Sequence, residues 1–443
     1  MSEKLLSVGL DVGTTSTQMV VSELEIENRA GSFAVPEMEI SNRRVLYKSP
    51  IHFTPLIAGE LVDGAGLGRI VDAEYAKAGI RKADVDTGAV IITGETSRKE
   101  NAAAVLEALS DHAGEFVVAT AGPDLESVLA AKGAGAVERS EKTGKPVLHM
   151  DIGGGTSNLA LIENGKIVAT TCLNVGGRLL KLDENGRVTY VSPALGGLFH
   201  GKVGDYVNRE TVLELARVLA QALEMAAGRR ERTALLEKLR TAEAGDFWPA
   251  VDGQVTVSFS GGVADCIDTR QPWLAYGDMG PELGQAIRES RLCQGEYALG
   301  HETIRATVIG AGCHSAQLSG STVYLQNVQL PLKNLPVVEH SADLAGLDGA
   351  GVLTMEGIPS PEYGQVARMA EKLVEEFGRR PVFLALREDM AKALGQQLAL
   401  RLGKEAQILC IDRVKLKAGD YLDVGIPIGP ALPVVVKTLV LGR

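Results

Sequence analysis

Short apolar runs alternate with helical segments along most of the chain. Continuous apolar runs that end in a turn, such as "LLSVGLDVG", "GAVIITGE" and "EFVVATAG", are typical of buried strands. The segment "SRKENAAAVLEALSDHAG" has apolar residues at helical spacing, with Gly114 at its end, and predicts a helix. Residues 34–79 contain several Pro and Gly residues and show neither pattern, so we expect them to be irregular.

The same order of elements then appears a second time. "PVLHMDIGG", "SNLALIEN" and "KIVATTCLNVGG" predict three strands, and "ENGK" at residues 163–166 predicts a hairpin turn. A helix that begins with "RETVLELARVLAQALEMAAG" is expected to continue to about Ala244. "VTVSFSGG" and "ATVIGAG" predict two more strands. The repeat indicates two similar domains that face each other.

The pattern changes after about Ser321, where further strands and a helix predict a small core of their own. We therefore expect an α/β protein of three parts, with domains at 1–145 and 146–320 and an added α/β region at 321–443.

Composition and charge exclude several classes of protein. A net charge of −11 argues against a general nucleic-acid binder and against electrostatic binding to anionic lipid. No stretch reaches the roughly 18 apolar residues that a membrane span needs, and the start "MSEKLLSVGLDVG" resembles no secretory signal, so a cytoplasmic location is expected. The five cysteines and seven histidines are scattered, which favours reduced thiols and argues against a structural zinc site.

Two glycine turns carry the candidate chemistry. Glycine removes the Cβ that would block a phosphate from backbone N–H donors, and Thr hydroxyls add further donors. An aspartate beside such a turn can act through Mg²⁺, with water between the metal and the carboxylate. One turn is predicted at Asp11 with Gly13, Thr14 and Thr15, and the other at Asp151 with Gly153, Gly154, Gly155 and Thr156. The alternative is a pair of tight β-turns in which each aspartate only caps the turn.

This pair of motifs resembles the superfamily of actin, the seventy-kilodalton heat-shock chaperones and the sugar kinases. The resemblance implies an actin-like ATPase fold, in which two duplicated ribonuclease-H-like domains bind Mg²⁺ with ATP or ADP in a cleft. It also implies an adenosine-binding strand that ends in two glycines. "VSFSGGVAD" fits that strand, with Gly261 and Gly262 at the positions of close approach, and "TVIGAG" at Thr307–Gly312 is a competing candidate. An ordinary strand-to-helix turn is the alternative for both.

The catalytic residue is less well defined by the resemblance. The related chaperones carry Asn-Glu-Pro before a crossing helix, and the glutamate orients the attacking water. In "TAGPDLESVLA" the matching position, aligned on Pro123, holds Gly122, which argues against fast ATP hydrolysis. Asp124 and Glu126 are the nearby acids that could align water. The alternative is that both are first-turn acids favoured by the helix dipole.

A narrower resemblance covers essentially the whole chain. "IITGETSRKENA", "DIGGGTSNLA", "GAGCHSAQLSGSTV" and the ending "PVVVKTLVL" look like the reactivating factors of ethanolamine ammonia-lyase. The resemblance implies a chaperone that uses Mg-ATP to free damaged cobalamin from the inactivated lyase, so that adenosylcobalamin can bind again. The lyase would be the partner, contacted through residues 34–79 or through the region after residue 320. Self-association and a place in a bacterial microcompartment stay open.

Three other functions fit parts of these patterns. A small-molecule kinase of the same fold would need a base to activate a hydroxyl, and none is evident. An actin-like assembly protein would form ATP-dependent filaments. A reactivating factor of diol or glycerol dehydratase is the third alternative, although those large subunits are longer.

Overall fold

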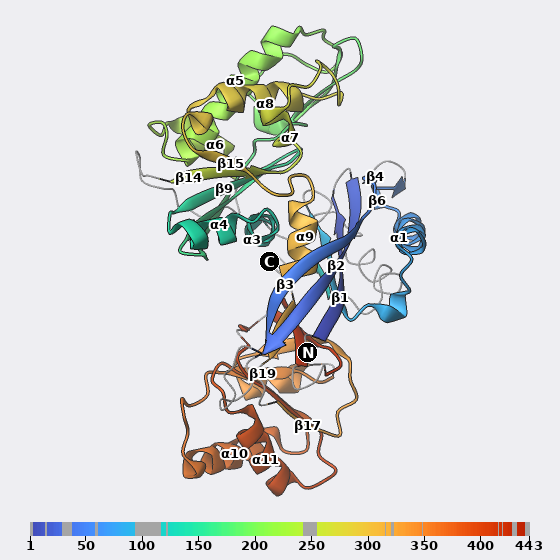
Figure 1. Ribbon diagram of the computed structural model, residues 1–443, viewed down its shortest axis with the longest axis vertical. Helices are drawn as coiled ribbons and strands as arrows, with labels where there is room; N and C mark the ends of the chain where they lie inside the picture. Colours follow the sequence, from blue (N-terminus) through green and yellow to red (C-terminus); the bar gives the residue numbers. More distant parts are fainter. Residues whose placement is uncertain are drawn as a thin grey trace. The chain divides into compact units, whose positions relative to one another are not determined.

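The structure is a computed structural model, and it describes residues 3–13, 16–28, 38–57, 61–93, 117–120, 123–241, 255–314, 316–319, 323–347, 349–414, 416–418, 420–427 and 432–438. The chain divides into two compact units that contain sheets and helices (Figure 1). The first unit holds residues 1–92, 99–120 and 315–443, and the second holds residues 93–98 and 121–314. The domain boundaries expected after residues 145 and 320 stay a prediction.

The first sheet belongs to the first unit and has the order β3-β2-β1-β7-β8, with β4 paired to β2. Its strands are β1 (Glu3–Val12), β2 (Ser16–Asn28), β3 (Met38–Lys48), β4 (His52–Phe53), β7 (Thr87–Ile92) and β8 (Val117–Thr120). The first three strands are antiparallel neighbours, whereas β7 runs parallel to β1 and β8 runs parallel to β7. A small hairpin, β5 (Leu56–Ile57) and β6 (Leu61–Val62), precedes the helix α1 (Gly64–Ala78), and a 3₁₀ turn (Lys82–Asp84) follows it.

The helix α1 covers the middle of this sheet. Leu67, Val71 and Tyr75 of α1 join the valines and leucines of β1 in one buried cluster. The side chain of Asp63 accepts a hydrogen bond from the N–H of Gly66 and so caps the helix start, and Gly79 ends the helix in the left-handed conformation.

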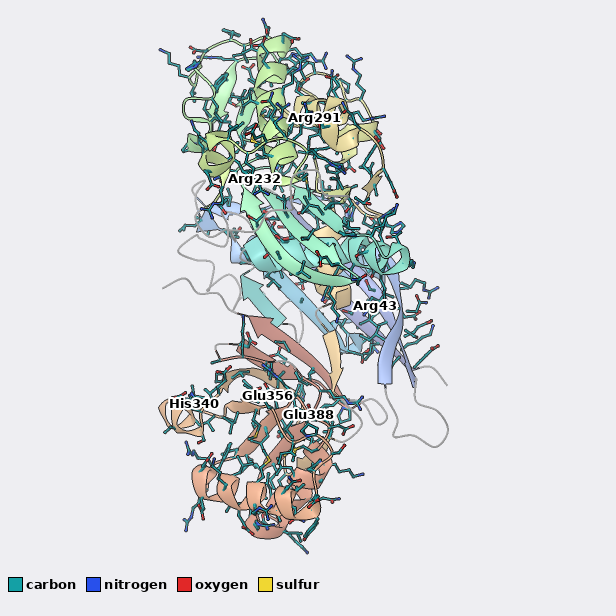
Figure 2. The ribbon with its side chains drawn as sticks, turned by 90° about the vertical axis from the view of Figure 1, so that its left-hand side faces the viewer. Arg43, Arg232, Arg291, His340, Glu356 and Glu388 are labelled. Atoms are coloured by element: carbon teal, nitrogen blue, oxygen red, sulfur yellow. The ribbon has the colours of Figure 1, made fainter. Side chains whose placement is uncertain are left out.

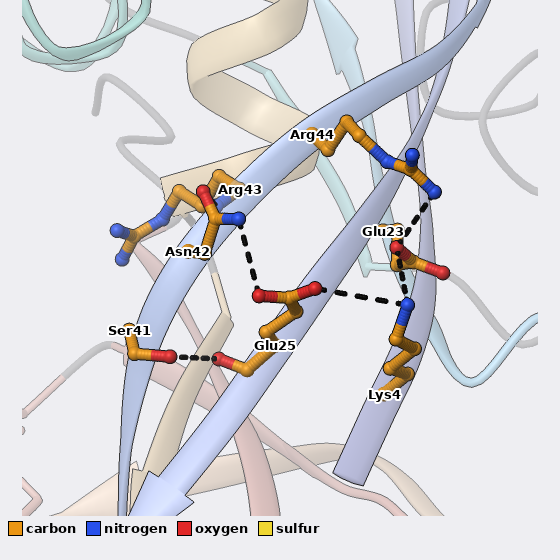
Figure 3. Close-up of polar contacts among 7 residues, drawn as sticks. All are labelled: Lys4, Glu23, Glu25, Ser41, Asn42, Arg43 and Arg44. Atoms are coloured by element: carbon orange, nitrogen blue, oxygen red, sulfur yellow. Dashed lines mark hydrogen bonds and ion pairs between the residues drawn. The ribbon is translucent and has the colours of Figure 1, made fainter. Parts of the chain in front are cut away.

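Polar side chains line one face of this sheet at the end remote from the turn at Gly13, while Leu5, Leu24 and Ile26 on the other face are buried. Figure 3 shows that Lys4 Nζ contacts Glu23 Oε1 at 3.0 Å and Glu25 Oε1 at 3.7 Å across neighbouring strands. Arg44 and Asn42 of β3 reach the same two carboxylates, at 3.0 Å and 3.1 Å. Such partly exposed pairs contribute about 1 kcal/mol or less each, so this face of the sheet is a solvated surface.

The second unit is built on a sheet of order β11-β10-β9-β14-β15. Its strands are β9 (Val147–Ile152), β10 (Ser157–Glu163), β11 (Lys166–Leu173), β14 (Thr256–Ser260) and β15 (Tyr297–Leu299). Its helices are α3 (Pro123–Gly133), α4 (Ala136–Thr143), α5 (Arg209–Ala226), α6 (Ala234–Leu239), α7 (Asp265–Asp268), α8 (Gly280–Glu289) and α9 (Ala306–His314). A hairpin of β12 (Leu180–Leu182) and β13 (Val188–Val191) and two 3₁₀ turns (Pro193–Leu195, Arg291–Cys293) complete this unit.

The two sheets have the same topology. Apart from the two-residue β4, the first strand along the chain in each sheet pairs antiparallel with the second, the second pairs with the third, and the fourth and fifth continue on the other side in parallel. The third strand of each sheet is followed along the chain by a long helix, α1 in one and α5 in the other. This repeated arrangement confirms the predicted α/β class and the predicted duplication.

The helices α3 and α9 each follow the fifth strand of a sheet, and they pack against each other in the second unit. A Cβ atom on Gly133 would lie 1.9 Å from the carbonyl oxygen of Ala306, and one on Gly310 would lie 2.0 Å from that of Leu129. Only glycine permits this backbone contact. The prediction that Thr307–Gly312 is a strand is therefore wrong: these small residues form a helix face that packs closely.

A third sheet lies in the C-terminal part of the first unit, with the order β16-β23-β22-β18-β19-β20-β21-β17. The strands β18 to β21 are parallel, and α10 and α11 pack on one face of them. Glu356, labelled in Figure 2, follows β19 and pairs with Arg387 after β20 at 2.5 Å. The elements are β16 (Ala316–Ser319), β17 (Tyr324–Gln326), β18 (Leu332–Val338), a 3₁₀ turn (Ser341–Gly346), β19 (Val352–Met355), α10 (Tyr363–Phe377), β20 (Val382–Leu386), α11 (Ala391–Leu402), β21 (Ile408–Ile411), β22 (Asp420–Val424) and β23 (Leu432–Thr438).

Two other predictions about secondary structure are wrong, and one lies outside the described residues. Residues 34–79 are not irregular throughout, because they contain β3 and α1. The helix from Arg209 ends at Ala226, since Gly228 takes a positive φ of 66°, and does not continue to Ala244. The helix predicted within residues 97–114 lies outside the described part of the chain. Among the described helices, none has the length and apolar character needed to cross a bilayer.

Candidate nucleotide-binding site

The turn after β9 has the shape that the glycine motif predicts. Asp151 is the second-last residue of β9, and Ser157 begins β10 directly after Thr156. The N–H of Gly153 donates to the carbonyl oxygen of Thr156 at 2.9 Å and closes the turn. Gly155 at its tip is exposed, and a Cβ there would meet no atom within 4 Å. The backbone at the tip of this turn therefore has room for a ligand.

A second glycine turn, residues 174–178 after β11, packs directly on this one. The N–H of Gly177 donates to the oxygen of Gly153 at 3.0 Å, and the N–H of Arg178 donates to that of Gly154 at 2.6 Å. A Cβ on Gly176 would lie 2.4 Å from the oxygen of Gly154, so the contact requires glycine.

A third turn, at Gly261 and Gly262, joins from the end of β14. Gly261 has a φ of 85°, and a Cβ there would lie 2.3 Å from the oxygen of Ile152. The N–H of Val263 donates to that same oxygen at 3.2 Å. The structure thus brings together the predicted residues Asp151, Gly153–Thr156 and Gly261–Gly262.

The carboxylate of Asp151 lies beneath these turns and is only 6% exposed. Its Oδ1 accepts a hydrogen bond from Ser260 Oγ at 2.5 Å, and its Oδ2 lies 3.5 Å from Thr307 Oγ1. Burial raises the pKa of Asp151 to about 6, and the two hydroxyl donors oppose that shift. The side chain is therefore mostly ionised at neutral pH.

His149 extends the network behind Asp151. His149 Nε2 lies 2.9 Å from Ser260 Oγ, and Nδ1 lies 2.8 Å from Ser258 Oγ. Because Ser260 gives its single proton to Asp151, it must accept the proton on Nε2 of His149, and Nδ1 then accepts from Ser258. Burial lowers the pKa of His149 to about 3, so the ring is the neutral Nε2–H form. Sequence reasoning treated this histidine as isolated, because its partners are more than 100 positions away.

Asn158 pairs with Asp151 in the register of β9 and β10 and lies on the same face of the sheet. Its side chain is 2% exposed, and its Oδ1 accepts no hydrogen bond from any residue that the structure describes. A buried acceptor oxygen beside a carboxylate suits the water shell of Mg²⁺, which prefers oxygen ligands and keeps several waters. No group of three or more His, Cys, Asp or Glu residues forms a metal site in the described ranges. The residues present therefore fit a hydrated Mg²⁺ and not a dedicated protein cage.

The turn after β1 repeats part of this geometry in the first unit. The N–H of Gly13 donates to the oxygen of Ser16 at 2.9 Å, as Gly153 does to Thr156. Asp11 is the second-last residue of β1 and is half-buried. Thr54 Oγ1 donates to the oxygen of Gly13 at 2.8 Å. The predicted donors Thr14 and Thr15 lie outside the described residues.

The two candidate catalytic acids lie in the first turn of α3. Glu126 is half-buried, and the side chain of Asp124 is outside the described set. Their roles stay predictions. The sequence analysis missed Arg178, Ser260, His149 and Asn158. The Gly-Gly pair after the strand of residues 166–173 was the one local signal for the second turn.

Two sheets of one topology, each with an aspartate and a glycine turn at the end of its first strand, define the class of protein: it has the actin-like ATPase fold. The match to known families is more specific. The chain belongs to the family of ethanolamine utilisation protein EutA, whose model matches residues 3–350 and 341–442.

Full-length relatives carry a functional name. The chain is 38% identical to ethanolamine ammonia-lyase reactivase EutA of Salmonella typhimurium and 38% identical to that of Escherichia coli, over 99% of each chain in both cases. A solved structure of a Ppx/GppA family member from Aquifex aeolicus is similar at a TM-score of 0.37 and 15% identity, over 60% of this chain and 69% of the other.

Proposed function

We propose that this chain is an ATP-dependent molecular chaperone that reactivates ethanolamine ammonia-lyase. It would release damaged cobalamin from the inactivated lyase and so let adenosylcobalamin bind again. The observation that carries the proposal is the full-length identity of 38% to proteins named as reactivases of this enzyme. The glycine turn at Asp151 supports the part that concerns ATP, because its exposed backbone is suited to phosphate.

Each unit would carry one glycine turn suited to binding phosphate. In the second unit, the turn Gly153–Thr156 would bind phosphate oxygens, and Gly261 and Gly262 would lie at the adenosine end. Asp151 and Asn158 would hold Mg²⁺ through water, with Asp11 as the matching carboxylate of the first unit. When bound, Mg²⁺ neutralises phosphate charge. Ser260 and His149 keep the carboxylate of Asp151 in one orientation, since both of their hydrogen bonds are directional.

Hydrolysis of ATP is proposed to be slow. The position of the chaperone glutamate holds Gly122, so water would have to be aligned by Asp124 or Glu126. Slow hydrolysis suits a protein whose output is a change of conformation. Moving a partner from a 1:99 to a 99:1 population needs about 5.5 kcal/mol of differential binding, which exchange of ATP for ADP could supply through different affinities for the lyase.

The contact with the lyase is proposed at residues 46–61 of the first unit. This segment gathers exposed apolar side chains, with Phe53 84% and Ile57 54% exposed. Among the described residues of the C-terminal part, Tyr363, Leu400 and Ile426 are exposed on separate segments. A cluster of exposed apolar side chains is typical of a protein-binding surface, whereas single ones are common everywhere. The exposed apolar side chains of this segment are Leu46, Ile51, Phe53, Leu56, Ile57 and Leu61.

A reactivation assay tests the function. Ethanolamine ammonia-lyase inactivated with bound cyanocobalamin is mixed with this protein, Mg-ATP and adenosylcobalamin, and both recovered activity and released cyanocobalamin are measured. We expect recovery that requires ATP and that is lost in Asp11→Asn and Asp151→Asn, but kept in the control Asp343→Asn, which changes an exposed residue of the third sheet region. Absence of recovery by a protein that still binds ATP would exclude the chaperone function, and small hydroxylated compounds would then be tested as phosphoryl acceptors.

The contact surface has its own test. Phe53→Ser together with Ile57→Ser should weaken binding of the lyase in a pull-down and leave ATP binding unchanged. Tyr363→Ser, at a residue 75% exposed, is the matched control. Equal binding of the lyase by the unchanged protein, the double variant and the control would show that the contact lies outside residues 46–61.

A further inference from the structure

Arg178 places a positive charge on the glycine turn of the second unit. Its backbone N–H donates to the oxygen of Gly154 at 2.6 Å. Its side chain then runs over the same residue, since a Cβ on Gly154 would lie 3.1 Å from Cδ and 3.4 Å from Cγ of Arg178. The guanidinium is thus carried on the turn that the phosphates would contact.

Asp278 holds this guanidinium in place. Arg178 Nε lies 3.4 Å from Asp278 Oδ2, and the Arg178 side chain is 39% exposed while that of Asp278 is 8% exposed. Asp278 Oδ1 accepts from the N–H of Gly280, the first residue of α8, at 2.9 Å. The N–H of Met279 donates to the oxygen of Gly177, so the backbone next to Asp278 is fixed to the same glycine turn. The arginine is therefore oriented by a nearly buried partner but is not itself buried.

We propose that Arg178 is a phosphate-binding residue of the nucleotide site and that Asp278 is its positioning residue. This inference rests on the proposed binding of ATP. A guanidinium presents five N–H donors in a planar fork that matches phosphate oxygens, and one contact with Asp278 through Nε leaves donors for a ligand. The guanidinium would also add positive charge beside the phosphates, in addition to that of Mg²⁺ near Asp151.

Nucleotide binding by the intact chain, measured by isothermal titration calorimetry with Mg²⁺, tests the proposal. The ligands are ATP, ADP and adenosine. Arg178→Gln should lower the affinity for ATP and ADP roughly 10- to 100-fold, the range expected for one charge-assisted hydrogen-bonded pair, and leave that for adenosine unchanged. Arg178→Lys keeps the charge without the fork and should show a smaller loss. Asp278→Asn should also show a smaller loss, since it removes only the positioning contact.

Arg217→Gln is the matched control, because Arg217 is a half-exposed arginine of α5 that pairs with Glu210 at 2.9 Å. It should bind all three ligands as the unchanged protein does. Wild-type affinity for ATP in Arg178→Gln would overturn the inference and leave the proposed function intact. Failure of the unchanged protein to bind ATP would overturn both the inference and the proposed function.

An equal loss of affinity for adenosine and for ATP in Arg178→Gln would also overturn the inference, because it would show a general change in the site. If Arg178→Gln does not fold by circular dichroism, Arg178→Lys decides: wild-type affinity for ATP in Arg178→Lys would overturn the inference, and a loss for ATP but not for adenosine would support it.

Discussion

A buried acid in the third sheet should make the stability of that region depend on pH. Asp412 follows β21 and has no exposed surface. Burial raises the pKa of Asp412 to about 7, followed by the charge of Asp389 and a hydrogen bond that protonated Asp412 donates to Asp389. The N–H of Ala391 at the start of α11 and the charge of Arg413 act in the opposite direction. Asp389 itself pairs with Arg413 at 2.9 Å, so the proton is expected on Asp412.

The sign follows from which state binds the proton. The pKa of Asp412 is about 7 in the folded chain and 3.8 by its ordinary value, so between these two pH values the folded state holds a proton that the unfolded state has lost. Its contribution to the free energy of unfolding is therefore fully present below about pH 4 and is lost as the pH rises through about 7. A difference of about three pKa units corresponds to about 4 kcal/mol as the upper limit of that loss.

Asp412→Asn keeps a donor toward Asp389 and cannot ionise. We expect the variant to match the unchanged protein at about pH 5 within roughly 2 kcal/mol, and to exceed it by up to about 4 kcal/mol at about pH 8. Native-state hydrogen exchange of the amides in β20 and β21 is the suitable assay, because a chain of two units need not unfold in one step.

Asp343→Asn is the control, since Asp343 is exposed. This substitution should leave the pH dependence of hydrogen exchange in β20 and β21 unchanged. The reasoning is refuted if Asp412→Asn lowers protection at about pH 8. That result would mean that Asp412 is ionised in the folded chain and is stabilised by its neighbours, as expected of a group with a pKa well below 7.

Two further predictions concern packing and charge. Gly310→Ala should destabilise the second unit by about 3 kcal/mol in a thermal melt, since its Cβ would lie 2.0 Å from the oxygen of Leu129. Gly364→Ala is the control and should be neutral in the same melt, because its Cβ would have no atom nearer than 3.6 Å. Glu74→Gln should cost the first unit about 2 kcal/mol at neutral pH, because three side chains bond its buried carboxylate. Burial raises the pKa of Glu74, but these three partners lower it overall, so the cost should shrink as an acid titration protonates the wild-type carboxylate.

Local sequence signals predicted the parts of the fold that local chemistry controls. "ENGK" is a two-residue hairpin, with Glu163 paired to Lys166 and positive φ at Asn164 and Gly165, because those two residues tolerate the left-handed conformation that such a turn needs. The strands before and after the turn at Gly153–Thr156 were predicted for a similar reason. A continuous apolar run beside a glycine turn is typical of a buried strand in an α/β chain.

The elements that sequence reasoning missed depend on contacts across long separations. Thr307–Gly312 has the composition of a buried strand, and only the close contact with α3 explains why it forms a helix. Arg178 follows a glycine pair that is typical of an ordinary turn in the sequence. Its place in the candidate site follows only from the packing of that turn against Gly153 and Gly154. His149 gains its role from serines on β14, which the parallel register of β9 and β14 places beside it.

The two glycine turns share their topology but differ in what holds them. A threonine side chain, Thr54, donates to the first turn at Gly13, whereas backbone N–H groups of Gly177 and Arg178 donate to the second. A side-chain contact can be lost or replaced by one substitution. Backbone contact at 2.6 to 3.0 Å requires that glycine be kept at a neighbouring position, as at Gly176. The two units thus contain equivalent strand–turn–strand segments. The arginine-bearing turn of the second unit is where we expect phosphate recognition to be strongest.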